Sequence, residues 1–381
     1  MKEKDMITSR DEQWRKELRE AMSPKERTAI PRAKMPMLDP GFRIHSNEEV
    51  NQGLSTEQAR LEATRCLDCP DPQCVTGCPV NIDIPGFIKN IQRGDNPAAA
   101  GVLRATSALP AVCGRVCPQE KQCESRCIYN KMKKAPVAIG CLERYAADTA
   151  AEADAIPEEP RLAPAGKKIA VVGSGPAGLS FAGDMARRGY DITVYEALHQ
   201  IGGVLKYGIP EFRLPNTVVD RELEALERQG VKFRPDTVVG KTLSYDDLLA
   251  EGYAGIFVAS GAGLPRFMGI PGENLINILS SNEYLTRVNL MHGGTPGYAT
   301  PVPRGARVAV IGGGNTAMDS VRTALRMGAE KAFLVYRRSE AEMPARREEV
   351  EHAREEGVEF MTLCNPVEYV CDERGHVKFI R

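Results

Sequence analysis

One supersecondary pattern occurs twice in this chain, and it constrains the fold more than any other feature. Residues 167–196 and 306–337 each contain an apolar run, a glycine-rich turn, a helical stretch and a second apolar run. Strands that alternate with helices in this way are typical of an α/β sheet. Two such units in one chain are much less expected by chance than one, so the repeat predicts two Rossmann-like units.

The first copy has the glycine spacing of a dinucleotide-binding turn. Gly173, Gly175 and Gly178 follow the run IAVVG and open the helix, and Glu196 ends the second run. Such glycines permit a tight turn, close approach of a pyrophosphate and close helix packing, while the acid accepts a hydrogen bond from a ribose hydroxyl. The alternative is a glycine turn in an ordinary α/β domain. Glycines and a basic residue in 202–215, soon after Glu196, favour FAD as the ligand.

The second copy differs from the first at the position that selects the nucleotide. Gly312, Gly314 and Ala317 follow the run RVAVIG, and alanine is a permitted small residue at the third position. Where the first copy has Glu196, the second has Arg337. A carboxylate would repel the 2′-phosphate of NADP, whereas an arginine pairs with it. The exchange predicts NADP(H) rather than NAD(H).

Two further arginines leave two interpretations open. Arg346 and Arg347 lie close behind the second copy. Either they add to a phosphate pocket, or they belong to the solvated face of a charged helix over 345–356.

Nine of the 11 cysteines lie within residues 1–150, and eight of them fall between residues 66 and 127. Thiolates suit zinc or iron–sulfur centres. Zinc sites usually show two CxxC pairs separated by a spacer, but here short spacings follow one another and end in Cys-Pro at 78–79 and again at 117–118. In ferredoxin-type runs the last cysteine serves a different cluster from the first three. The spacing therefore favours two iron–sulfur clusters with crossed ligation over zinc or inert buried cysteines.

The ligand count leaves one position open. Two [4Fe–4S] clusters need about eight ligands, and Cys113 breaks the symmetry of the cysteine pattern. If Cys113 serves the turn instead of a cluster, the eighth ligand comes from elsewhere. Cys141 and Glu143 are the nearest candidates, and they face different directions because they lie two residues apart in a predicted helix.

Composition excludes several classes of function. The net charge of −1 offers no electrostatic case for binding nucleic acid or a membrane surface. No apolar run approaches the roughly 18 residues of a membrane span, and the charged N-terminus lacks the apolar core of a signal peptide, so a cytoplasmic protein is expected. There is no nucleophile elbow and no HExxH motif, so no catalytic side chain is assigned.

Composition also divides the chain. Residues 151–166 are rich in Ala, Pro and Glu and are typical of a linker. Helices are predicted over 56–65 and near 85–92, 97–106 and 137–148. We predict a helical [4Fe–4S] cluster domain over 1–155, an FAD-binding domain over 156–303 and an NADP-binding domain over 304–381.

Five segments resemble the small (β) subunit family of NADPH-dependent glutamate synthase. They are CLDCPDPQCVTGCPVNIDIPGFI (66–88), ALPAVCGRVCPQEKQCESRC (108–127), VAIGCLERY (137–145), YGIPEFRLP (207–215) and VYRRSEAEMPAR (335–346). The large subunit of NADH-dependent ferredoxin:NADP oxidoreductase and the N-terminal half of dihydropyrimidine dehydrogenase are similar too. The resemblance implies an α-helical double iron–sulfur cluster domain, followed by an α/β Rossmann-like flavoprotein fold with two dinucleotide-binding domains, incomplete at the C-terminus.

The resemblance also implies site residues. One cluster would be held by Cys66, Cys69, Cys74 and Cys127, and the other by Cys78, Cys117, Cys123 and Glu143, with Cys113 and Cys141 unligated. FAD would bind at Gly173, Ser174, Gly175, Pro176, Ala177, Gly178, Glu196, Gly202, Gly203 and Arg213. NADPH would bind at Gly312, Gly313, Gly314, Asn315, Thr316, Arg337, Arg338 and Arg346.

The implied function is electron input for glutamate biosynthesis: electrons pass from NADPH through FAD and two [4Fe–4S] clusters to a partner, the large subunit of glutamate synthase. The alternatives are the electron-bifurcating ferredoxin:NADP oxidoreductase, whose partner is a flavin/ferredoxin reductase subunit, and a redox scaffold without NADPH turnover. Family members continue for roughly a hundred residues more, about a domain's worth. Residues 376–381 are typical of a strand cut in mid-sheet, so a truncated chain is expected.

Overall fold

The computed structural model describes residues 9–156 and 162–381. Contacts divide the chain into two compact units. As far as they are described, the first holds Met1–Met37, Asn51–Gly202 and Asn216–Ser260, and the second holds Leu38–Val50, Gly203–Pro215 and Gly261–Arg381. The predicted linker over 151–166 falls partly outside the described residues, at 157–161. The predicted domain boundaries stay predictions, because contacts do not show which segments fold independently.

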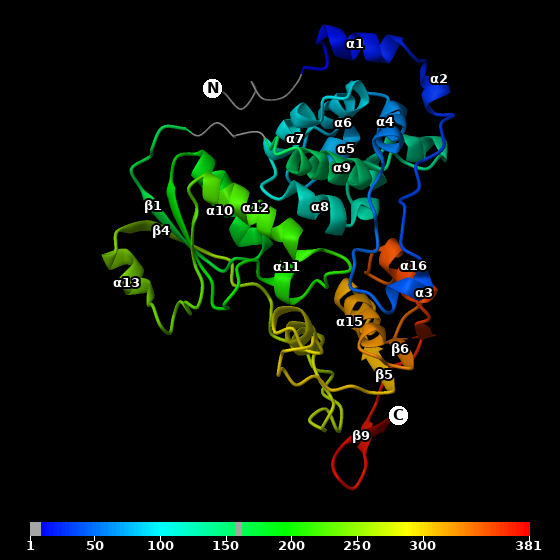
Figure 1. The fold of residues 1–381 in the computed structure, drawn as a ribbon, viewed down its shortest axis with the longest axis vertical. Coiled ribbons are helices and arrows are strands. Elements are labelled where there is room, and N and C mark those ends of the chain that lie inside the picture. Colours follow the sequence, from blue (N-terminus) through cyan, green and yellow to red (C-terminus); the bar gives the residue numbers. More distant parts are fainter. Residues whose placement is uncertain (1–8, 157–161) are drawn as a thin grey trace. The chain divides into compact units, whose positions relative to one another are not determined.

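Helices form the N-terminal part of the first unit. They are α1 (Gln13–Glu20), α2 (Pro24–Arg27), α4 (Thr56–Arg65), α5 (Gln73–Thr76), α6 (Ile84–Arg93), α7 (Asn96–Arg104), α8 (Pro110–Val116) and α9 (Ile139–Glu152), with 3-10 turns at Gln119–Lys121, Glu124–Arg126 and Ile128–Met132. The helices α4 and α6 to α9 gather into one bundle (Figure 1). All four predicted helices are confirmed, and α9 runs four residues beyond its predicted end.

Side-chain caps explain where several of these helices begin. Ser55 accepts from the Gln58 N–H, and the Gln58 side chain accepts from the Ser55 N–H, which makes a capping box before α4. Asp83 and Asp95 accept backbone N–H bonds at the starts of α6 and α7. The helices then bury apolar faces against one another, through Ala59, Ala63, Phe87, Ile88, Ile91, Val102, Leu103, Leu142 and Ala146. The bundle therefore holds the cysteine loops between capped and packed helices.

A parallel sheet completes the first unit. Its order is β3-β2-β1-β4, with β1 (Lys168–Val172), β2 (Asp191–Tyr195), β3 (Lys232–Arg234) and β4 (Tyr253–Val258). Helix α10 (Pro176–Arg187) packs on β1 and β2, α13 (Tyr245–Ala250) packs on β4, and α12 (Asn216–Arg228) contacts α8 of the bundle. A buried ion pair of 2.6 Å between Arg104 and Glu222 ties α7 to α12. The sheet and the bundle thus share one packed unit.

The second unit contains the second copy of the repeat. Its parallel sheet has the order β5-β6-β7, with β5 (Arg307–Ile311), β6 (Lys331–Tyr336) and β7 (Glu359–Thr362). The helices of the unit are α3 (Pro40–Arg43), α11 (Val204–Tyr207), α14 (Ser281–Leu285), α15 (Asn315–Arg326) and α16 (Arg347–Glu355), and there are single turns at Thr286–Leu290 and Glu340–Glu342. Both copies of the repeat therefore fold as strand, glycine turn, helix and parallel strand, as predicted.

The C-terminal residues form a strand, as predicted, and this strand lies outside the parallel sheets. The prediction that it is cut in mid-sheet stays a prediction. Strand β9 (Val377–Ile380) pairs antiparallel with β8 (Tyr369–Cys371) in a separate ribbon. The turn explains the pairing, because Gly375 has a φ of +81° and the Asp372 carboxylate accepts from the Arg374 and His376 N–H groups.

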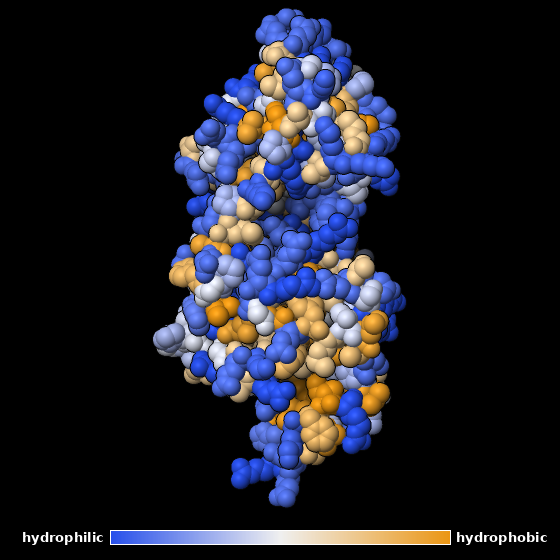
Figure 2. Space-filling view, turned by 90° about the vertical axis from the view of Figure 1, so that its right-hand side faces the viewer, coloured by the Kyte–Doolittle hydropathy of each residue, from blue (hydrophilic) through white to orange (hydrophobic). Residues whose placement is uncertain are grey.

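Apolar residues gather in the lower part of the view in Figure 2. None of the described helices is long and apolar enough to cross a membrane.

Candidate cofactor sites

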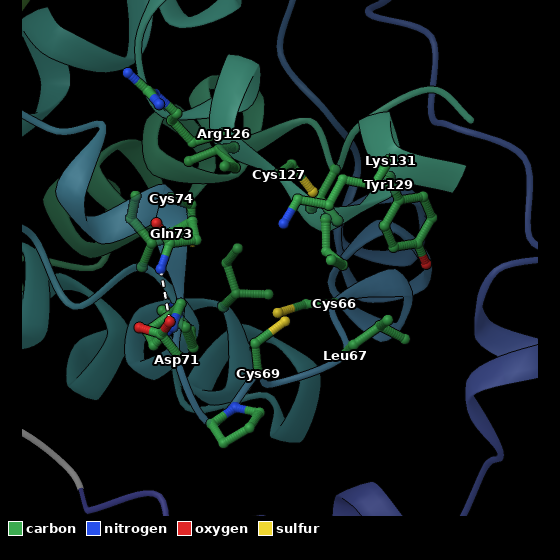
Figure 3. Close-up of a pocket in the computed structure, with 18 residues that line it drawn as sticks. Cys66, Leu67, Cys69, Asp71, Gln73, Cys74, Arg126, Cys127, Tyr129 and Lys131 are labelled. Carbon is green, nitrogen blue, oxygen red and sulfur yellow. Dashed lines mark hydrogen bonds between the residues drawn. The ribbon is translucent and has the colours of Figure 1, made fainter. Parts of the chain in front are cut away.

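Four cysteines surround a cavity of about 270 Å³ in the helical bundle. Cys66 directly follows α4, Cys69 lies in the next loop, Cys74 lies in α5, and Cys127 comes from the 3-10 turns that precede α9. Figure 3 shows the sulfur atoms of Cys66, Cys69 and Cys127 directed into this cavity. The structure therefore brings together the four residues predicted for the first cluster, although Cys127 is distant from the others in sequence.

The loop between the first two cysteines is held by buried charge. Asp68 is fully buried and has a φ of +51°, a conformation that is uncommon for a residue other than glycine. Its carboxylate pairs with Arg15 and Arg19, and its carbonyl oxygen accepts from Arg10 at 2.8 Å. These contacts fix the turn that directs the thiols of Cys66 and Cys69 to the same side.

Burial keeps these thiols protonated until something binds them. Burial raises the pKa of the Cys66 thiol. It also raises the pKa of Cys69 to about 11 and raises the pKa of Cys74 by more than that. The charges of Cys66 and Cys127 also raise the pKa values of Cys69 and Cys74, because the four sulfur atoms are close together. Iron or zinc would displace such protons. The four thiols and the cavity that they line fit a cluster.

A second group consists of Cys78, Cys117, Cys123 and Glu143. The charge of Glu143 raises the pKa values of Cys78 and Cys123, and the charge of Cys117 raises that of Glu143. Glu143 is buried, which raises its pKa well above the usual range, and its Oε1 has no hydrogen-bond partner among the described residues. An unsatisfied buried carboxylate is costly. It fits a ligand position that an iron atom would complete.

The two remaining cysteines of the helical region lie in different surroundings. The Cys113 thiol hydrogen-bonds to Cys117 and to Ser107. The charge of Cys141 acts on Arg32, which pairs with Glu124 at 2.8 Å. The expectation that Cys141 and Glu143 face different ways therefore holds, and it is Glu143 that lies with Cys78, Cys117 and Cys123. The ligand assignment itself stays a prediction.

The first glycine turn has the geometry that each glycine was expected to serve. Gly173 has a φ of +102°, and a Cβ there would meet the Ala259 carbonyl oxygen at 2.3 Å. A Cβ on Gly178 would meet the Gly173 carbonyl oxygen at 2.0 Å, whereas one on Gly175 would meet nothing within 4 Å. The open position lies at the N-terminus of α10, where Pro176 and Ala177 begin the helix. A phosphate fits there, close to the backbone and the helix dipole.

The acid at the end of β2 is held beneath this turn. One Glu196 oxygen accepts from the Ser174 N–H at 2.9 Å and from the Ser174 hydroxyl, and the other accepts from the Leu198 N–H at 2.9 Å. The Gly202 N–H in turn donates to the Ser174 hydroxyl at 2.9 Å. The predicted ribose acid and the predicted glycine segment are therefore joined by hydrogen bonds.

The second glycine turn repeats the open position of the first. Gly312 has a φ of +141°, and a Cβ on Gly314, before α15, would meet nothing within 4 Å. A Cβ on Gly313 would meet the Tyr336 ring at 2.7 Å, so this position requires glycine. Asn315 and Thr316 begin α15. Here too the helix N-terminus is accessible to a phosphate.

The arginines around the second turn fall into two kinds. Arg337 and Arg338 are exposed just after β6, and ligands of parallel sheets bind at the carboxyl ends of strands. Arg346 is buried, its N–H donates to Asn315 Oδ1 at 2.9 Å, and its guanidinium pairs with Glu348 at 2.9 Å. The exposed pair suits a 2′-phosphate, whereas Arg346 also supports the turn.

Two family models match the chain, one for each part. The model described as dihydropyrimidine dehydrogenase domain II, 4Fe-4S cluster, matches residues 43–155, and that of pyridine nucleotide-disulphide oxidoreductases matches 167–380. The glutamate synthase [NADPH] small chain of Halomonas elongata is 39% identical over 338 residues, 87% of this chain and 71% of that protein. This chain belongs to the glutamate synthase small-chain family. The predicted family and fold class are confirmed: a helical iron–sulfur domain precedes a Rossmann-like fold for FAD and NAD(P).

Other relatives are similar at nearly the same level. The putative oxidoreductase UacF of Escherichia coli is 38% identical over 86% of this chain, and the NADPH-Fe(3+) oxidoreductase subunit beta of Geobacter sulfurreducens is 37% identical over 82%. The chain covers 52% of UacF and 46% of the Geobacter subunit, about half the length of each. The family is one of NAD(P)H-dependent flavin oxidoreductases, and similarity alone does not separate the roles of its members.

Arg213, a predicted FAD contact, has other partners in this small-chain-family structure. Its Nη1 lies 2.8 Å from Asp319 of α15, and its Nε lies 3.3 Å from Glu349 of α16. Both acids are buried and were not anticipated from the sequence. The buried Lys89 beside Cys66 was also missed. The sequence signal for the burial of Lys89 was its place among the apolar residues of α6. No such signal marks the two buried acids in the sequence, because charged helix residues ordinarily face water.

Proposed function

We propose that this chain takes electrons from NADPH onto FAD and passes them through two [4Fe–4S] clusters to a larger partner subunit. The observation that carries the proposal is the convergence of Cys66, Cys69, Cys74 and Cys127 on one cavity. A flavoprotein that reduced its substrate directly would not need such a site. Flavin, when bound, accepts two electrons together and releases them singly to one-electron carriers.

The chain's own residues supply binding and orientation. In the proposal, Gly175 and the start of α10 hold the FAD pyrophosphate while Glu196 holds its ribose. Gly314 and the start of α15 hold the NADPH pyrophosphate, and Arg337 and Arg338 pair with the 2′-phosphate. Cys78, Cys117, Cys123 and Glu143 hold the second cluster. No side chain would need to act as a nucleophile or base, because bound nicotinamide and flavin would exchange the hydride directly.

We further propose a glutamate synthase large subunit as the partner, which places the chain in glutamate biosynthesis. The names of the relatives support a multisubunit enzyme, because they include small chains and beta subunits. The similar identity of UacF and of the Fe(3+) oxidoreductase subunit supports other acceptors equally well. A flavin/ferredoxin reductase partner is the second candidate, and the motifs shared by both families favour neither.

Anaerobic reconstitution tests the function in two stages. The chain, loaded with FAD, iron and sulfide, is expected to reduce an artificial dye with NADPH. No turnover with bound cofactors would favour a redox scaffold instead. The large subunit of a glutamate synthase is then added with glutamine and 2-oxoglutarate. Glutamate formation dependent on both chains supports the partner, whereas dye reduction without glutamate formation contradicts it and leaves the electron-input function standing.

A further inference from the structure

A lysine lies fully buried beside the first cysteine site. The Lys89 side chain, on α6, donates from Nζ to the Cys66 carbonyl oxygen at 2.6 Å and to Gln92 Oε1 at 2.7 Å. Both acceptors are neutral, so these bonds satisfy the ammonium without cancelling its charge. Burial lowers the pKa of Lys89 to about 8, and an anion close by would favour its protonated form. An uncancelled positive charge in the interior is unusual enough to need an explanation.

The charges around Lys89 leave the surroundings of Cys66 positive. Lys89 and Arg27 both act electrostatically on Cys66. The nearby carboxylate of Asp68 is already paired with Arg15 and Arg19. The anion that would balance Lys89 is therefore the one that the cysteines themselves form when they bind a cluster.

At the second site the buried cations next to its ligands in sequence have a carboxylate partner, because Arg115 and Arg144 both pair with Asp148, at 2.8 and 3.2 Å. The charged groups that raise the pKa values of Cys78 and Cys123 are carboxylates and thiolates, including Glu143 and Glu124. Backbone N–H groups reach sulfur in both sites, at Cys66 from Asp68 and at Cys78 from Val80 and Ile82. On the proposed assignment each site also has four anionic ligands. The two sites therefore differ in the charged groups that surround their ligands, and not in the ligands themselves.

We propose that the buried ammonium of Lys89 makes the cluster held by Cys66, Cys69, Cys74 and Cys127 the more readily reduced of the two. This inference rests on the proposed function, because it presumes that both clusters form. Reduction adds one negative charge, which a nearby cation stabilises most strongly where water is excluded. Lys89 is a positioning residue that acts through Cys66 and through its field, and it is not a ligand. Electrons would then collect at the first site, whatever accepts them afterwards.

A redox titration followed by electron paramagnetic resonance tests this directly. The signal of the first cluster is identified as the one that changes in Cys69→Ser. In Lys89→Met, which keeps the length of the side chain and removes its charge, the reduction equilibrium of that cluster is expected to fall at least tenfold, or 59 mV for one electron. The second cluster should keep its potential. Lys89→Arg, which keeps the positive charge, should leave the potential of the first cluster close to that of the wild-type protein.

Lys131 offers a matched control. It lines the same cavity but is exposed, so water screens its charge. Lys131→Met should shift the potential of the first cluster much less than Lys89→Met does. Equal shifts, or an unchanged potential in Lys89→Met, would overturn the proposal.

If Lys89→Met does not assemble its first cluster, the potentials of the two clusters in the wild-type protein test the proposal. The proposal requires the first cluster to have the higher potential of the two, and the reverse order overturns it whatever the variant does. A wild-type chain that takes up no iron–sulfur cluster would instead overturn the proposed function. The two failures are therefore distinguishable, because the first occurs with both clusters present.

Discussion

The Nη1 atom of Arg213 lies 2.8 Å from Oδ2 of Asp319, and both side chains are buried. The Asp319 side chain belongs to α15, which follows the second glycine turn, whereas Arg213 lies in the segment that follows the first copy of the repeat. Glu349 of α16 also lies against Arg213. This segment is therefore attached to the second unit by buried charge.

Removal of Arg213 should destabilise the protein before any cofactor is bound. Arg213→Ala leaves Asp319 and Glu349 with less compensation in the interior, and breaking a buried ion pair from one side costs about 3–5 kcal/mol. The free energy of unfolding of the cofactor-free chain, measured in urea, should fall by that amount. The control is Lys331→Ala, which breaks an exposed pair with Glu359 and should cost less than about 1 kcal/mol. A stable cofactor-free Arg213→Ala would mean that the arginine acts mainly on FAD.

The same cluster should make stability depend on pH. Burial alone would raise the pKa of Glu349, but Arg213 and Arg322 lower it to about 2. A folded pKa below the ordinary value of 4.5 stabilises the protein above that pH, and the stabilisation is lost as the pH falls toward 2. The advantage of the wild-type chain over Glu349→Gln in unfolding free energy should therefore shrink below about pH 4.5. Glu359→Gln, in an exposed pair, should show a much smaller change, and a difference independent of pH would contradict the role of Glu349.

Local geometry explains what the sequence could predict. The glycine turns at 173–178 and 312–317 lie between one strand and the helix that follows it, so a few neighbouring residues specify their conformation. The helix that begins after Ser55 is likewise specified by its own capping box. These elements were found where the sequence predicted them.

Contacts between distant residues explain what it could not predict. The spacing of the cysteines indicated crossed clusters, but the meeting of Cys127 with Cys66 depends on how the bundle folds, and the ligand sets came from the family resemblance. Lys89 and Asp68 are charged residues whose burial depends on partners elsewhere in the chain. Charged side chains are ordinarily exposed, so no local sequence signal marks Asp68, and the apolar neighbours in α6 were the signal for Lys89.

Nucleotide preference should depend on Arg337. The side chain is exposed just after β6, where a 2′-phosphate would form a charge-assisted hydrogen bond worth about 1.5–3 kcal/mol. Arg337→Glu should therefore lower the ratio of kcat/KM for NADPH over NADH by roughly ten- to a hundredfold. Arg374→Glu makes the same charge change on the exposed turn of the β8–β9 ribbon and should leave the ratio unaltered. An unchanged ratio in Arg337→Glu would remove Arg337 from the phosphate site.

The eighth cluster ligand can be identified by comparing two positions on α9. The unsatisfied Oε1 of Glu143 lies buried in the second group of donors, while Cys141 acts on Arg32 instead. Anaerobically purified wild-type protein should hold about eight irons per chain. Glu143→Ala should lower the iron content or change the electron paramagnetic resonance signal of the second cluster, because one iron loses its protein ligand. Cys141→Ala should retain both the iron and the signal, and the opposite order of effects would transfer the ligand role to Cys141.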